Sequence, residues 1–317
     1  MIFSYGNNNN MKNTKTIKTI LFATLILTLI IPTTSFSIAN AEDEKLPLGK
    51  IMTPFGPWDE NKVHEWDGKT PIDADVIIEK WQREHPDEKS PAQKIIEERA
   101  QKRTEIANQR SNGEEPIPTH HGWNMAAWYD HGSAMDKFTG TWSVPNDPVF
   151  YQTGDAIFTF ISMETADFQA IIQPVLQYGT SAKCAVADWR IASWFVIADQ
   201  AWFASTCQNA DPGDVISGDM TRNFGQTWTI KTKNVSDNIT TSLQVSTSRN
   251  WVNAQVAYES WYLAHNCDSI SNDVHFTNLS LNNGAITPTW TETYWTTWCG
   301  MDVNIVSPTH VDLNNNN

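Results

Sequence analysis

Short runs of alternating apolar and polar residues fill the chain from residue 119 onward, and this pattern constrains the fold more than any other feature. In one such run, Trp228 and Ile230 fall on one side and two lysines fall on the other. Turn-forming groups such as Asp211-Pro212-Gly213-Asp214 separate the runs. A period of two is typical of half-buried strands, and no helical period of 3.6 intervenes. The sequence therefore predicts an all-β, antiparallel sandwich or barrel over residues 119–317.

The composition changes near residue 118. Residues 42–118 hold twelve basic and eighteen acidic residues and few long apolar runs. One helix is predicted from Ala74 to Arg83. A second begins at Ser90-Pro91-Ala92-Gln93, a capping-box pattern with proline at the first helical position, and ends near Gly113. This charged helical segment is either a removable prosegment that folds against the following domain or a solvated linker. The sequence does not decide between these two hypotheses.

An export signal is predicted at the N-terminus. Three lysines between residues 11 and 18 precede an apolar run at 20–31, and Ala39-Asn40-Ala41 completes an A-x-A cleavage pattern. The apolar run is shorter than the roughly 20 residues that a membrane-spanning helix needs. We therefore expect residues 1–41 to be a leader and signal peptide, and the protein to be secreted without stable membrane insertion after cleavage. A retained N-terminal anchor is the alternative.

Secretion would place the four cysteines in an oxidising compartment. Four cysteines allow three pairings, and the sequence alone does not choose among them. We expect the nearer neighbours to pair, because each pair would bracket a short β meander: Cys184 with Cys207, and Cys267 with Cys299. Three N-glycosylation sequons predict a glycoprotein if the host makes glycans; they begin at Asn234, Asn238 and Asn278.

The charge of the chain argues against nucleic-acid binding. The formal net charge is -14, and after residue 118 there are seven Lys and Arg against eighteen Asp and Glu, a difference of -11. Such a surface repels a phosphate backbone, and no basic stripe offsets it. We expect a monomer that does not bind nucleic acid.

Several common hydrolase signatures are missing from the sequence. It contains no Gly-x-Ser-x-Gly, no His-Glu-x-x-His and no Asp-Thr-Gly or Asp-Ser-Gly. His120-His121 with His131 is a weak metal-site candidate, because adjacent histidines near a domain boundary are more often exposed polar residues. We expect neither a metal nor a cofactor.

Two polar residues lie inside strongly apolar β runs. Glu259 lies in Val256–Leu263 among aromatic residues, and Gln177 lies in Ile171–Gly179. A glutamate among Trp and Tyr loses solvation, which raises its pKa toward the range useful for general acid–base catalysis. Alternating strands also place polar residues on their solvent face, so neither residue alone identifies a catalytic group.

The order of motifs between Phe138 and Leu281 resembles that of the glutamic peptidases, a family of secreted, acid-acting endopeptidases. Val175-Leu176-Gln177-Tyr178-Gly179 is similar to the Leu-Gln-x-Gly motif that carries the family's catalytic glutamine. Ala254-Gln255-Val256-Ala257-Tyr258-Glu259 resembles the Ala-Glu-Trp-Ile-x-Glu motif, whose last glutamate is catalytic. Further segments resemble family motifs in the same order, at residues 138–145, 188–194, 211–214, 238–241 and 273–278.

The resemblance implies a fold, a mechanism and a set of site residues. The fold would be a sandwich of two large antiparallel sheets, of the concanavalin-A-like or jelly-roll type, preceded by the helical segment. Glu259 would act as general base on a water, and Gln177 would stabilise the oxyanion, with a polypeptide substrate and no cofactor. If residues 42–118 are a removable prosegment, the chain would be a zymogen. The residues expected to contact substrate are Glu164, Trp189, Trp194 and Trp261.

Several positions depart from the family motifs. Glu164 stands where the family has an aspartate, and Phe160 replaces a tryptophan in the same strand. Ser181 replaces an acidic residue four positions after the glutamine, and Gln255 replaces the first glutamate of Ala-Glu-Trp. These changes leave both catalytic residues in place, but they also permit a relative that has lost its activity.

Two other classes of function stay open. A carbohydrate- or protein-binding sandwich would present exposed tryptophans and would not need Glu259. A glycosidase would use Glu164 and Glu259 as a carboxylate pair, about 5–5.5 Å or about 6.5–9.5 Å apart.

Overall fold

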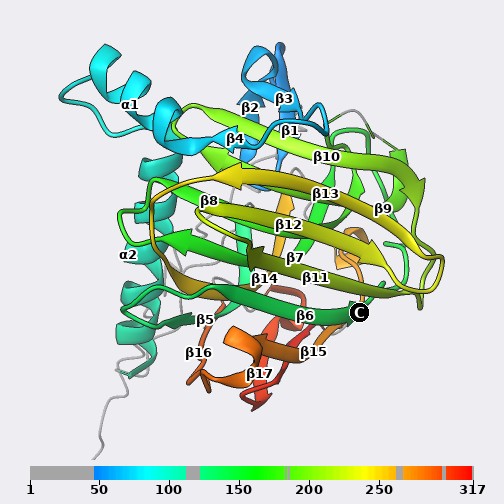
Figure 1. Ribbon diagram of the computed structural model, residues 1–317. Coiled ribbons are helices and arrows are strands. Elements are labelled where there is room, and N and C mark those ends of the chain that lie inside the picture. The colour runs from blue at the N-terminus through cyan, green and yellow to red at the C-terminus, as the bar shows by residue number, and fades with distance from the viewer. Residues whose placement is uncertain are drawn as a thin grey trace, which may run out of the picture. The chain divides into compact units, whose positions relative to one another are not determined.

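Two eight-stranded β-sheets, packed face to face, form the body of the protein in a computed structural model (Figure 1). The structure describes residues 46–111, 122–182, 184, 186–261, 267–294 and 298–315. The expected signal peptide and its cleavage site lie outside these residues, as do His120 and His121. Short 3-10 turns interrupt the strands at Glu60–Lys62, Cys267–Ser269, Asn282–Gly284 and Trp298–Gly300.

The first sheet carries the candidate residues. Its strands in spatial order are β16 (Thr291–Tyr294), β5 (Gly122–Asp130), β14 (Trp251–Trp261), β7 (Ala156–Thr165), β8 (Ala170–Gly179), β9 (Val186–Ile197), β10 (Gln200–Asn209) and β3 (Val63–Glu65). Every pair is antiparallel except β10 with β3.

The second sheet has the same number of strands. Their order is β17 (Asp302–Ser307), β18 (His310–Asn314), β15 (Val274–Leu281), β6 (Lys137–Ser143), β11 (Val215–Arg222), β12 (Thr227–Asn234), β13 (Ile239–Ser246) and β4 (Ile72–Asp73). Strand β4 is parallel to β13, and the other pairs are antiparallel. The prediction of an all-β antiparallel sandwich is confirmed.

The main core lies between the two sheets. Strand β12 shows the predicted alternation, with Trp228 and Ile230 buried and Lys231 half-buried on the other face. The largest side chains of this layer come from both sheets; they include Phe138, Trp142, Trp189, Trp251 and Phe276. Burying such aromatic side chains is the main source of stability for a sandwich of this kind.

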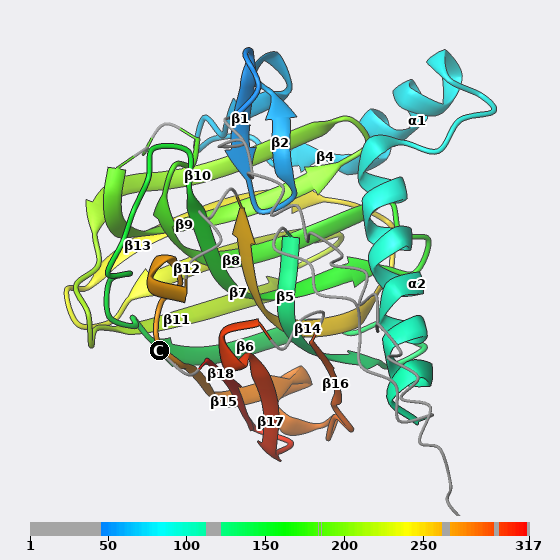
Figure 2. The ribbon, with the colours of Figure 1, turned by 180° about the vertical axis from the view of Figure 1, so that it is seen from behind.

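Three neighbouring strands of the first sheet are buried along both faces. Every residue of β7, β8 and the first ten residues of β14 is buried. One face packs on the second sheet, and the N-terminal segment covers the other, which we call the covered face (Figure 2). Continuous burial explains why these strands read as apolar runs in the sequence.

The cover consists of helix α2 (Pro91–Ser111) and a hairpin of β1 (Lys50–Thr53) and β2 (Gly56–Asp59). Helix α2 begins where the capping pattern predicts, because the Ser90 hydroxyl accepts the Gln93 backbone N–H at 3.2 Å. Its inward stripe follows the three-and-four spacing of a helix face and consists of Ala92, Ile96, Arg99, Arg103 and Ile106. Helix α1 (Ala74–Glu84) is capped by Asp73 and precedes α2.

Both expected disulfides are present: Cys184 pairs with Cys207, and Cys267 with Cys299. The sequons differ in their surroundings. Asn238 and Asn278 are exposed, whereas Asn234 is buried and donates its amide to Asp214 at 2.7 Å. Asn234 therefore does not lie in an exposed loop, as its sequon would require, whereas the other two asparagines are accessible. Within the described residues, no helix is long and apolar enough to cross a membrane.

Candidate functional site

Glu259 and Gln177 stand in one row across three neighbouring strands. Glu259 of β14 is the register partner of Phe158 on β7, and Phe158 is the register partner of Gln177 on β8. Register partners share a face, and adjacent strands lie about 4.8 Å apart, so the two Cα atoms are separated by roughly 9–10 Å. Both side chains are on the covered face, on interior strands of the first sheet.

The Glu259 carboxylate is held by side chains on two sides. Its Oε1 accepts the indole N–H of Trp261 at 2.5 Å and the guanidinium of Arg99 at 3.2 Å. Glu259 is fully buried, and the Arg99 side chain is 11% exposed. A buried carboxylate is retained only with a partner of opposite charge or good donors, and Glu259 has both.

Burial raises the pKa of Glu259 to about 7, even though the charge of Arg99 and the hydrogen bonds from Trp261, Trp123 and Arg99 lower it. Desolvation outweighs these favourable contacts because the carboxylate is removed from water on every side. A carboxyl group with a pKa near neutrality can accept and return a proton in the same reaction cycle. This is the environment predicted from its aromatic neighbours.

Gln177 is oriented by the donors around it. Its Oε1 accepts the indole N–H of Trp194 at 3.1 Å and the hydroxyl of Ser181 at 3.3 Å. An indole N–H can only donate, so the atom that it contacts must be the amide oxygen. The amide NH2 of Gln177 is therefore directed away from Trp194 and is held as a donor.

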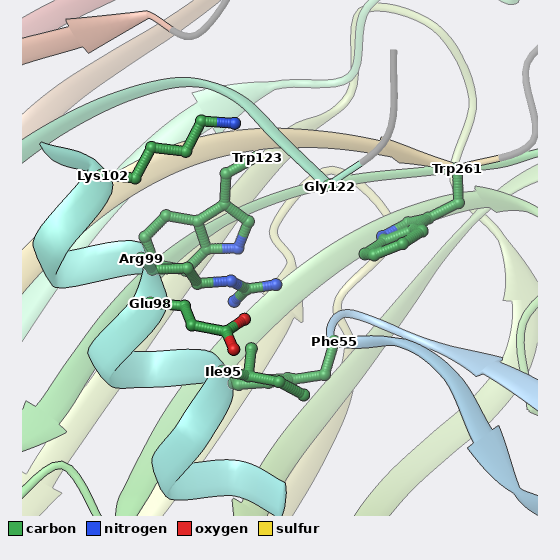
Figure 3. Close-up of a pocket in the computed structure, with 8 residues that line it drawn as sticks. All are labelled: Phe55, Ile95, Glu98, Arg99, Lys102, Gly122, Trp123 and Trp261. Atoms are coloured by element: carbon green, nitrogen blue, oxygen red, sulfur yellow. The ribbon is translucent and has the colours of Figure 1, made fainter. Parts of the chain in front are cut away.

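Arg99 fills the space above Glu259. Its guanidinium lies 4.6 Å from the ring centre of Phe55 and 4.2 Å from that of Trp123, an aromatic sandwich drawn in Figure 3. A cavity of about 230 Å³ remains beside it, bordered by Trp261 and Gly122. Gly56 of the hairpin presses against Trp261 so closely that an added Cβ would lie 2.6 Å from the ring. The hairpin and α2 thus close over Glu259 together.

A second arginine lies one helical turn farther along α2. Arg103 is 2% exposed, and it donates to Glu164 at 3.3 Å and to Gln255 at 3.1 Å. Its guanidinium also faces the Trp128 ring at 5.2 Å. Glu164 and Gln255 are fully buried on the covered face. Each buried glutamate is therefore matched to its own arginine on α2.

The covered face holds more polar groups than α2 satisfies. Buried polar atoms without a hydrogen-bond partner among the described residues include both amide atoms of Gln173, the hydroxyl of Ser162, Oε1 of Glu164 and Nε2 of Gln255. Each such atom costs about 1–3 kcal/mol when it is left unpaired. A face shaped only to pack against α2 would be apolar, so this one is suited to a polar occupant as well.

The positions of Trp189 and Glu164 differ from what the sequence analysis expected. Trp189 was expected to contact substrate, but it is buried between the two sheets against Tyr178, because its position on β9 points away from the covered face. Glu164 and Glu259 do share a face. However, Glu164 lies beside Asn253, six residues from Glu259 along β14, which places the Cα atoms roughly 20 Å apart. This spacing is unfavourable for a glycosidase carboxylate pair.

Comparison with solved structures gives distant likenesses. The chain is similar to scytalido-glutamic peptidase bound to a peptide-based transition-state analogue, with 15% identity, a TM-score of 0.45 and coverage of 61% of this chain and 98% of that one. It is similar to SCP-B, an eqolisin-family peptidase in complex with the tripeptide Ala-Ile-His, with 14% identity, a TM-score of 0.41 and coverage of 61% and 98%. The enzymatically active domain of tailspike protein 2 from bacteriophage CBA120 follows at 8% identity, a TM-score of 0.27 and coverage of 47% and 23%.

No protein-family model matches the sequence, and no curated protein is detectably similar to it. Likenesses at these levels do not establish membership of a family. The chemistry of the covered face has to be argued from its own residues.

The sequence did not reveal the two arginines that pair with the glutamates. A signal was present: Arg99 and Arg103 occupy the same helix face as Ile96 and Ile106, where a charged residue needs a buried partner. The partners lie 160 and 61 residues away in the chain. No local pattern connects such distant residues.

Proposed function

We propose that this protein is a secreted, glutamic-type endopeptidase that is made in a latent form. The observation that carries the proposal is the placement of Glu259 and of an oriented Gln177 in register on one face of a sheet, both buried under the N-terminal segment. The resemblance of the motifs adds an acidic working range and a polypeptide substrate to the proposal.

In the proposed reaction, a water lies between the two side chains once the face is open. Glu259 removes a proton from this water as its oxygen attacks the scissile carbonyl carbon. The Gln177 NH2 group donates to the oxyanion that forms. Glu259 then returns the proton to the amide nitrogen as the C–N bond breaks, so the products are a carboxylic acid and an amine. Trp194 and Trp261 serve as positioning residues for Gln177 and Glu259.

The latent form follows from the cover. Helix α2 and the β1–β2 hairpin occupy the space in which a polypeptide would have to lie, and Arg99 engages the proposed general base. Residues 42–118 therefore act as a prosegment in this proposal, and their displacement or removal is required for activity. The unpaired groups of Gln173, Ser162 and Gln255 would then meet the backbone of an extended substrate, and Glu164 would contact a substrate side chain.

The proposal is tested by first removing residues 42–118 from the secreted chain by limited proteolysis and then incubating it with a denatured protein substrate from acidic to neutral pH. We expect cleavage that chelators do not inhibit, and loss of cleavage in Glu259→Gln by a factor of about 10²–10⁴. Gln177→Ala should lose about 10²–10³. Asp302→Asn, on an exposed position of β17, is the control and should retain activity. Activity of Glu259→Gln near that of the wild type would exclude the mechanism.

Glu164→Gln, together with Glu259→Gln, separates the rival functions. A glycosidase would require Glu164 and Glu259 equally and would cleave a polysaccharide, whereas the peptidase should retain measurable activity in Glu164→Gln. A carbohydrate-binding sandwich should retain polysaccharide in Glu259→Gln. None of the tryptophans whose exposure the structure describes is exposed, so these residues do not present the platforms that such a binding function needs.

A further inference from the structure

A group of metal-ligating side chains lies on the outer face of the second sheet, away from the two glutamates. His275 of β15 is the register partner of Asp312 on β18, and Asn304 of β17 is the register partner of Asp312 on its other side. His310 precedes Asp312 by two residues on β18 and therefore shares its face. The neighbouring residues Val274, Phe276, Val311 and Leu313 are buried in the main core, so this row points outward.

The two imidazoles converge on one carboxylate oxygen. His275 Nδ1 is 2.8 Å and His310 Nε2 is 2.7 Å from Oδ1 of Asp312. The three ligand atoms all lie within 4.8 Å of one another. The histidine side chains are 54% and 35% exposed, and that of Asp312 is 14% exposed. The group is therefore preformed and open to an ion from solution.

We propose that His275, His310 and Asp312 form a binding site for a divalent transition-metal ion, with Zn²⁺ as the ion that best fits the ligands. Two imidazole nitrogens and a carboxylate oxygen are a ligand set that zinc prefers, and three protein ligands leave a fourth position for water. Asn304 donates to the other oxygen of Asp312 at 3.4 Å and so orients the carboxylate.

The fit requires only a small adjustment. Zinc bonds of about 2.0–2.2 Å in tetrahedral geometry place neighbouring ligand atoms roughly 3.3–3.5 Å apart. The two histidine–aspartate distances therefore open by about half an ångström when the ion replaces the shared protons. Exposed side chains on a regular sheet can make this change by rotation. The alternative is that the two histidines only form hydrogen bonds with Asp312 and that the three side chains bind no ion.

The site would connect the C-terminal strand to the body of the sheet. Strand β18 lies between β15 and the edge strand β17, and the proposed ligands come from β15 and β18. A bound ion would hold the two strands together by a second link besides their backbone hydrogen bonds. Because the site is on the other sheet from Glu259, its occupancy should change stability rather than peptide cleavage.

The test is a zinc titration of the metal-free secreted chain at neutral pH, followed by calorimetry and by the visible absorption of Co²⁺ as a probe. We expect one equivalent to bind and to raise the melting temperature. His275→Gln, His310→Gln and Asp312→Asn should each weaken binding by about tenfold or more. His131→Gln, a histidine hydrogen-bonded to Tyr129 on β5, is the control and should leave binding unchanged.

The outcomes separate this inference from the proposed function. Binding to the wild type no tighter than to the His275→Gln/His310→Gln double variant would overturn the site, whether or not the chain cleaves peptides. A titration that all three ligand variants alter, with peptide cleavage unchanged, would establish it. Far-ultraviolet circular dichroism of each variant serves to check that the surface substitutions leave the fold intact.

Discussion

Glu259 occupies a position that is costly for stability. It is a fully buried carboxyl group among Trp123, Trp261 and Phe55, and its pKa is raised because burial disfavours the charged form. A residue retained only for packing at this point would be apolar, because buried charge destabilises a fold unless it is fully compensated. Strongly perturbed ionisable groups of this kind cluster at functional sites. The retention of a destabilising carboxyl group at this buried position therefore supports the hypothesis that Glu259 is catalytic.

The raised pKa of Glu259 predicts how the stability of the folded chain depends on pH. The pKa of Glu259 is about 7 in the folded chain against an ordinary value of 4.5. Both states are protonated well below 4.5, so there the group has no effect. As the pH rises from 4.5 to 7, the unfolded chain ionises first, and the folded chain loses about 3 kcal/mol of relative stability. We expect the free energy of unfolding of the wild type to fall across this range.

The Glu259→Gln variant isolates this effect. Burial also raises the pKa of Asp155, to about 6, so part of the fall in stability has another source. The variant retains Asp155 and should lack the Glu259 part, so the difference between the two denaturation curves should grow with pH and level off above about 7. A constant difference between the curves at every pH would contradict the raised pKa.

At the scale of elements, the sequence predicts where helix α2 begins and how long it is. It does not predict which sheet face the helix packs against. Its start at Ser90-Pro91 and its length follow from capping residues and helix propensity, which are local properties. The sheet face that it covers depends on Arg99 and Arg103 meeting glutamates from β14 and β7. Strands β7, β8 and β14 were likewise recognisable as buried, but the register that aligns Glu259 with Gln177 is set by tertiary packing.

The arginines of α2 should control how tightly the helix is held. Replacing Arg99 with Met leaves the Glu259 carboxylate buried without its cation, and breaking a buried pair in this way costs about 3–5 kcal/mol. The charge of Arg99 lowers the pKa of Glu259, so its stabilising contribution is present above about pH 7 and is lost as the pH falls through that value. The Arg99→Met variant should therefore be destabilised more in weakly alkaline solution than at acidic pH.

Hydrogen exchange of the α2 backbone measures this change directly. We expect faster exchange in Arg99→Met than in the wild type. Under the proposed function, this variant should also begin to cleave peptides sooner. Lys94→Met, on the same helix with an exposed side chain, serves as the control and should behave as the wild type. Equal exchange rates in both variants would show that the Arg99–Glu259 pair does not hold the cover.

At the scale of the whole molecule, the N-terminal segment completes the sandwich as well as covering it. Strand β3 extends the first sheet beside β10, and β4 extends the second beside β13. Strands of two and three residues have too few positions to show a period, so the sequence could not predict them. The sandwich itself was predictable because long alternating strands and frequent turns allow few other architectures.

This arrangement predicts that residues 42–118 assist the folding of the domain that follows. Without them, the covered face would present Phe158, Phe160, Val175 and Trp194 together with unpaired polar atoms, and β10 and β13 would become open edges. Exposed apolar surface and unpaired edges promote association of partly folded chains. We expect a chain of residues 119–317 to refold from denaturant with a much lower yield of monomer than a chain of residues 42–317, and addition of a separate 42–118 segment to restore part of that yield. Light scattering and recovered circular dichroism measure the yield, and equal recovery of both chains would show that the sandwich needs no cover in order to fold.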